Sequence, residues 1–184
     1  ASIAGWVFQR VFHVVHGAVR GGHVDILQQM EQRFGVFSNS CSQYFSNVVN
    51  LALHQDREEV AEWMVLHLDK DLRLLADTVI PNGSVRLLER IVDGLNEDDL
   101  NFLRQQRDLF AYTCAIYRKK QMMLHLQSRS LLPTSAYELC ESSKSMHNLL
   151  HSLLPYDTLY NQDISDTLGW ICHTFGPKRR KIAP

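Results

Sequence analysis

Nine histidines and four cysteines supply the side chains that could hold a metal ion or act as nucleophiles. His147 and His151 are four positions apart on an expected helix, so they share a face, with Cys140 upstream. No matching cysteine pair or carboxylate motif completes a metal site. We therefore interpret the two histidines, like His13 and His16, as lying at the edge of packed helices, and we expect no bound metal.

The pattern of catalytic residue types is equally sparse. Cys172 and His173 are adjacent, so on a helix their side chains point about 100° apart and do not readily hydrogen bond. The chain has no G-x-S-x-G, no phosphate-binding glycine loop and no H-E-x-x-H, and the acidic cluster at residues 97–99 is typical of a helix start. We predict no catalytic residue, no enzymatic activity and no cofactor.

A basic run lies in the C-terminal tail, residues 176–184, after an expected final helix over residues 164–175. Gly176 and Pro177 end that helix. The run that follows consists of Lys178, Arg179, Arg180 and Lys181. A proline before four consecutive cations on a flexible end resembles a monopartite nuclear localisation signal, which binds as an extended peptide in the acidic groove of an import receptor. The sequence thus predicts a nuclear import receptor as one partner, with a solvated terminal charge run as the alternative.

A second basic cluster, Arg118, Lys119 and Lys120, follows Tyr112 and Tyr117. Cations beside aromatic rings can contact RNA or DNA. The chain as a whole has a formal charge of −1 and a pI near 6.8, so it has no global field that attracts nucleic acid. We interpret the cluster as a solvated helix end, with nucleic-acid contact as the alternative.

Length and composition fit one soluble domain or one short repeat array. The chain has 184 residues, of which 45% are hydrophobic, enough to build a core. No apolar run approaches the roughly 18 residues of a membrane-spanning helix. The four cysteines are far apart, and Cys114 and Cys140 lie inside apolar helical patterns, so we expect reduced thiols and no disulfide framework.

The hydrophobic pattern is helical throughout. Apolar residues recur at spacings of three and four, as at residues 60–68, 85–92, 122–126 and 149–154. Breaker clusters separate these stripes, among them residues 38–42, 81–84, 96–99, 133–135 and 155–157. We expect one all-α, repeat-like domain over residues 1–175, with about five helix pairs.

An internal repeat accounts for the order of these stripes. The segment 16–30, a helix that ends in glycines before a second helix, overlays 50–64 when moved on by 34 positions, with Ala18 on Ala52. A further 27 positions bring Gly22 onto Gly83, and another 35 bring Cys114 opposite Ala18. A last copy near residues 138–154 fits loosely. The shared unit is a small residue, a turn and two adjacent apolar residues.

The first copy resembles an ankyrin repeat. His16-x-Ala18 is similar to the family's H-x-A, and Gly22-His23-x-x-Ile26-Leu27 is similar to its G-H-x-x-V-V core. The resemblance is clearest over residues 12–34 and extends more weakly to about 154, without the family's T-P. It implies a solenoid-like array of stacked helix pairs; an irregular helical bundle is the alternative.

The resemblance also implies where a partner would bind. In ankyrin arrays the first helices line a concave face, so the exposed positions just after the small residue are the expected contacts: Arg20, His54 and Tyr117.

We predict a non-catalytic protein–protein interaction scaffold, an adaptor or an inhibitor, acting in the nucleus with a cytoplasmic pool. One alternative is a pathogen-type helical effector that is secreted into a host cell and targets a host nuclear protein, because degenerate repeats followed by a nuclear signal suit such an effector. The start Ala1-Ser2-Ile3, without an initiator Met, is typical of a processing boundary and fits a removed leader. A second alternative is a nucleic-acid-binding helical repeat protein.

Overall fold

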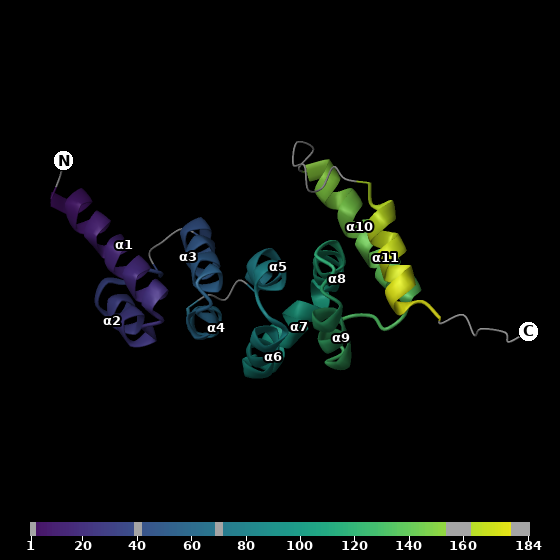
Figure 1. The fold of residues 1–184 in the computed structure, drawn as a ribbon, viewed down its shortest axis with the longest axis horizontal. Coiled ribbons are helices and arrows are strands. Elements are labelled where there is room, and N and C mark those ends of the chain that lie inside the picture. The colour runs from purple at the N-terminus through teal and green to yellow at the C-terminus, as the bar shows by residue number, and fades with distance from the viewer. Residues whose placement is uncertain (1–2, 39–41, 69–71, 154–162, 178–184) are drawn as a thin grey trace, which may run out of the picture. The chain divides into compact units, whose positions relative to one another are not determined.

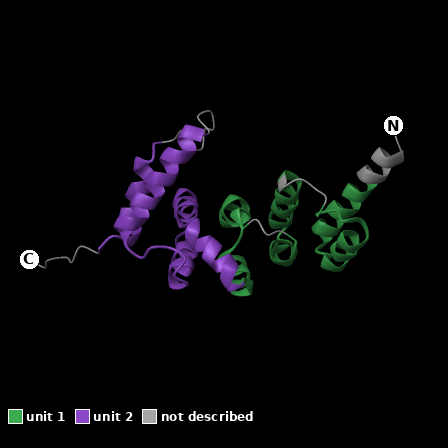
Figure 2. Ribbon diagram, turned by 180° about the vertical axis from the view of Figure 1, so that it is seen from behind, with its two compact units in different colours: residues 1–95 green, residues 96–184 purple. Residues whose placement is uncertain are grey.

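The computed structural model describes residues 3–38, 42–68, 72–153 and 163–177. Every regular element in these ranges is a helix, which confirms the all-α prediction. The chain falls into two compact units, residues 1–95 and residues 96–184 (Figure 2). The single domain expected over residues 1–175 stays a prediction.

Unit 1 holds the first three of the expected helix pairs (Figure 1). Its elements are α1 (Ile3–Gly21), α2 (Val24–Phe34), α3 (Ser42–His54), α4 (Glu58–His67), the π-helix η1 (Leu75–Val79), α5 (Ile80–Asn82) and α6 (Val85–Gly94). The first helices of successive pairs contact each other, α1 with α3 and α3 with η1 and α5, and so do the second helices, α2 with α4 and α4 with α6. Each pair therefore packs on the next within the unit.

The core of unit 1 includes residues of the two apolar stripes predicted over 60–68 and 85–92 and further apolar residues of α1, α2 and α3. Among its fully buried side chains are Val19, Leu27, Val49, Val60, Met64, Leu87 and Ile91. Burial of these surfaces is the main stabilising term for helices as short as α4 and α6, which are marginal alone in water.

The same turn joins the two helices in three of the copies. The carbonyl of the small residue accepts a hydrogen bond from the amide five positions on: Ala18 from His23 at 2.9 Å, Ala52 from Arg57 at 2.8 Å and Cys114 from Lys119 at 2.8 Å. The residue between them has a left-handed backbone, with φ of 75° at Gly22, 54° at Asp56 and 55° at Arg118. This is the Schellman arrangement that satisfies the last carbonyls of a helix.

The third copy ends its first helix differently. Gly83, which the alignment pairs with Gly22, has φ −86° and ψ 174°, an extended conformation. The hydroxyl of Ser84 then accepts a hydrogen bond from the amide of Leu87 at 3.1 Å and caps α6. A side chain at position 83 would come within 2.7 Å of the Val79 carbonyl oxygen, so glycine is needed here for close backbone approach.

Unit 2 consists of α7 (Glu97–Gln105), α8 (Arg107–Ile116), α9 (Lys120–Ser128), α10 (Ala136–Leu153) and α11 (Ser165–Phe175). Helices α8 and α9 form the fourth helix pair, and α10 and α11 both pack on α8 and on each other. Residues 138–153, expected as a last loose copy, form one continuous helix. The final helix expected over residues 164–175 is confirmed as α11. None of the helices in the described part of the chain is long and apolar enough to span a membrane.

Candidate functional site

The turns of unit 1 carry two of the three expected contact residues. Arg20 and His54 are both exposed, and each lies two positions after its small residue, Ala18 or Ala52. The guanidinium Nε of Arg57, in the second turn, donates a hydrogen bond to the carbonyl oxygen of Arg20 at 3.0 Å. A cation at the C-terminal end of α1 also complements the helix dipole. The structure thus brings the first two turns together.

Polar contacts continue from the second copy to the third. A ring nitrogen of His54 lies 2.8 Å from the carbonyl oxygen of Asn50. The side-chain amide of Asn82, in α5, donates to the side-chain oxygen of Asn50 at 3.0 Å. We refer to Arg20, Asn50, His54, Arg57 and Asn82 together as the turn surface. It offers hydrogen-bonding groups from three successive copies to solvent.

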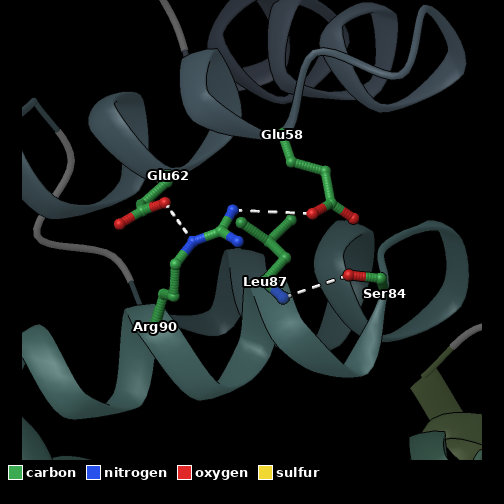
Figure 3. A network of polar contacts seen from close by, with 5 residues as sticks. All are labelled: Glu58, Glu62, Ser84, Leu87 and Arg90. Atoms are coloured by element: carbon green, nitrogen blue, oxygen red, sulfur yellow. Dashed lines mark hydrogen bonds and ion pairs between the residues drawn. The ribbon is translucent and has the colours of Figure 1, made fainter.

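A different polar network joins the second helices. Arg90 of α6 donates from Nε to Glu62 at 2.5 Å, and its Nη2 lies 3.5 Å from Glu58, both on α4 (Figure 3). The hydrogen bond to Glu62, more than the charges of the two carboxylates, raises the pKa of the guanidinium. All three groups are partly solvent-exposed, so the network holds α6 on α4 with only a modest net energy.

The fourth copy carries the remaining expected residues: Tyr117, Arg118 and Lys119 on the turn between α8 and α9, and Lys120 as the first residue of α9. Tyr117 and Lys120 are exposed, and Lys119 is half-buried as the residue before α9. The Arg118 guanidinium lies over the Trp170 ring of α11, 5.5 Å from its centroid. One of the three cations is therefore engaged in a cation–π contact inside unit 2.

A cleft of about 330 Å³ opens beside this turn. Its lining residues come from α8 and the turn after it, from α10, and from α11 and the two residues before it: Tyr112, Ile116, Arg118, His147, Asp163, Ile164, Asp166 and Thr167. The hydroxyl of Tyr112, a buried side chain, lies 3.0 Å from Nδ1 of His147. Burial, more than the neighbouring His151, lowers the pKa of His147, while Asp163 opposes the shift. His147 is therefore a neutral hydrogen-bonding group at pH 7.

The charged groups at the mouth of the cleft are stabilised locally. The carboxylate of Asp163 accepts a hydrogen bond from the backbone amide of Ser165 at 2.9 Å, which lowers the pKa of Asp163. One guanidinium and two carboxylates thus border a buried phenol and a neutral imidazole. Such a mixture can hydrogen bond to a polar segment of a partner.

The histidine pair singled out from sequence lies as its spacing predicts. The rings of His147 and His151 are 6.2 Å apart between centroids. Nδ1 of His147 faces Tyr112, and within the described residues no three side chains of His, Cys, Asp or Glu are grouped to hold a metal ion.

Two contacts in unit 2 were not predicted from the sequence. One is the Tyr112–His147 contact, and the other is the pair Cys140 and Cys172, whose Sγ atoms lie 3.6 Å apart although the residues are 32 positions apart in sequence. Both depend on how α10 packs, and no local periodicity signals that packing. The predicted localisation signal at residues 178–181 lies outside the described residues.

No family model, no curated protein and no solved structure matches this chain.

Proposed function

We propose that the chain is a non-catalytic protein-binding scaffold, an adaptor or an inhibitor, built from stacked ankyrin-like helix pairs. The observation that carries this proposal is the turn shared by the first two copies of unit 1, which leaves the polar side chains of Arg20 and His54 in solvent at corresponding places. Repeated turns on one scaffold present several small contacts to one partner, as repeat proteins do.

The helix–helix contacts within unit 1 support the proposal that its helix pairs are stacked. Successive first helices contact each other, and successive second helices do the same. This order of contacts between successive helix pairs favours a stacked array over an irregular bundle. The bound Arg57 guanidinium and the Asn50–Asn82 pair link neighbouring copies at their turns, so the turn surface is preorganised, which lowers the entropic cost of binding.

The turn surface suits a partner rich in hydrogen-bond acceptors. Guanidinium and side-chain amide N–H groups recognise carboxylates and backbone carbonyls. The chemistry favours an acidic or extended loop of another protein over an apolar helix.

The proposal is tested by capturing partners with the full chain and with the double variant Arg20→Ala/His54→Ala. The matched control is Gln29→Ala/Arg33→Ala, which removes one polar and one cationic exposed side chain from α2. We expect a partner that binds the wild type and the control and that loses at least about tenfold in affinity for the turn variant. Equal binding by all three proteins would place the contact elsewhere and contradict the proposal.

We also propose that the protein acts in the nucleus. The support is the basic run Lys178–Lys181 behind a proline, close after the end of α11 at Phe175. A separate experiment, given in the Discussion, tests this part.

A further inference from the structure

Two thiols of unit 2 face each other across the hairpin of α10 and α11. Sγ of Cys140, in the second turn of α10, lies 3.6 Å from Sγ of Cys172, in the last turn of α11. The residues are 32 positions apart, so helix packing brings them together. A disulfide bond is about 2.05 Å long, so closure needs a relative displacement of about 1.5 Å.

The surroundings of the two thiols differ. Cys172 is exposed, whereas Cys140 is partly buried, with Sγ 3.9 Å from the carbonyl oxygen of Leu168. Burial, followed by the hydrogen bond to Cys172, raises the pKa of Cys140 to about 11. Cys140 therefore stays protonated at neutral pH, and an oxidant in solution reaches Cys172 first.

The third described cysteine provides an internal contrast. Cys114 is completely buried in α8, and burial raises its pKa to about 12 although Lys119 opposes the shift. A thiol in this position is inert towards soluble oxidants.

We propose that Cys140 and Cys172 form an oxidisable pair that closes into an intramolecular disulfide between α10 and α11, with a small-molecule disulfide of the glutathione type as the oxidant.

The reaction has two exchange steps. The thiolate of Cys172 attacks the small disulfide, forms a mixed disulfide and releases one small thiolate, which takes up a proton. Cys140 then loses its proton to solvent and attacks Sγ of Cys172, which releases the second small thiol. In sum, two protein thiols and one small disulfide give one protein disulfide and two small thiols, with two electrons passing to the oxidant.

Closure would fix the walls of the cleft in unit 2. His147 lies on α10 and Thr167 on α11, and both line the cleft. Trp170 of α11 carries the Arg118 contact. A covalent link between α10 and α11 holds these groups in one arrangement.

Peptide mapping of the full chain tests the pairing. The folded protein is incubated with oxidised glutathione, quenched with acid and alkylated under denaturing conditions, and a second sample is oxidised in guanidinium chloride. We expect a monomer in which Cys140 and Cys172 are linked and Cys114 is alkylated, with this preference lost in denaturant. A major product with glutathione retained on Cys172, a pairing to Cys41 or Cys114, or an intermolecular dimer would overturn the proposal.

Thermal unfolding tests the consequence for the fold. The link closes a loop of 32 residues, so the oxidised chain should melt at least about 5 °C higher than the reduced chain. Cys140→Ser and Cys172→Ser should each remove this difference. Cys114→Ala should keep it, because alanine stands at the corresponding positions 18 and 52. An oxidised chain that melts no higher than the reduced chain would show that the pair does not join the two helices in the native fold.

Discussion

The hydroxyl of Tyr112 and Nδ1 of His147 lie 3.0 Å apart and join α8 to α10 across 35 positions of sequence. The rings also meet edge to face, with 5.9 Å between their centroids. Removing this partner would take one hydrogen bond from the hydroxyl of a buried side chain. The contact therefore couples the packing of α10 to the protonation state of one histidine.

The stability of the protein should fall when the pH drops below about 6.5. Burial lowers the pKa of His147 in the folded chain from its ordinary value of 6.5, so the unfolded chain binds the proton more tightly. The contribution of the neutral imidazole is complete above pH 6.5 and is lost as the pH falls from there through the folded-state pKa. Urea denaturation at a series of pH values, followed by circular dichroism, measures this slope.

The variant His147→Gln is the control, because it isolates the contribution of this histidine from those of the other histidines in the chain. We expect the difference in unfolding free energy between wild type and variant to shrink as the pH falls from 7 to 5. Tyr112→Phe should cost about 1 kcal/mol at pH 7, the usual value of one buried hydrogen bond. A wild-type–variant difference that does not change with pH would argue that His147 is not the coupled group.

Glycine should be favoured at the left-handed position of both turns, so removing it from one turn and introducing it into the other should have opposite effects on stability. Gly22 has φ 75°, and a Cβ there would lie 3.2 Å from Cδ of Arg57, so Gly22→Ala should destabilise the protein by about 1–2 kcal/mol. Asp56 has the same left-handed backbone, with φ 54°, so Asp56→Gly should be neutral or stabilising. Urea denaturation of both variants measures the two signs. If both variants were destabilised to a similar extent, the left-handed backbone would not decide the preference for glycine at position 56, and the two turns would not be equivalent.

The sequence predicted the helices and three of the turns because these depend on local physics. Gly22 is a C-terminal helix signal in its own right. Asp56 and Arg118 adopt the same backbone without glycine, and only their alignment with Gly22 indicates it. At Gly83 the alignment was misleading. This glycine aligns with Gly22, but its backbone is extended because Ser84 caps the next helix.

The contacts of α10 could not be predicted in this way. Tyr112–His147 and Cys140–Cys172 join residues 35 and 32 positions apart. Their formation depends on the length of α10, an uninterrupted helix of 18 residues where a weaker helix pair was expected.

The paired apolar residues of the first copy should differ sharply in their energetic roles. Leu27 is fully buried, whereas Ile26 retains 36% of its exposure. Leu27→Ala should therefore cost about 2–5 kcal/mol through lost burial and the cavity left behind. Ile26→Ala should cost less than about 1 kcal/mol. Denaturation of the two single variants checks the difference. Equal losses of unfolding free energy in the two variants would indicate that Ile26 is shielded from water in solution.

The basic tail should direct the protein to the nucleus. At 21.2 kDa the chain is small enough to diffuse, so the test uses a fusion to several fluorescent protein copies that cannot pass the nuclear pore passively. Changing Lys178, Arg179, Arg180 and Lys181 together to alanine should remove nuclear accumulation, because the extended cations are the groups that an acidic receptor groove binds. Changing the two lysines to arginine keeps the charge and should keep accumulation. A fusion that accumulates equally without the four cations must enter by another route, and the run is then only a solvated chain end.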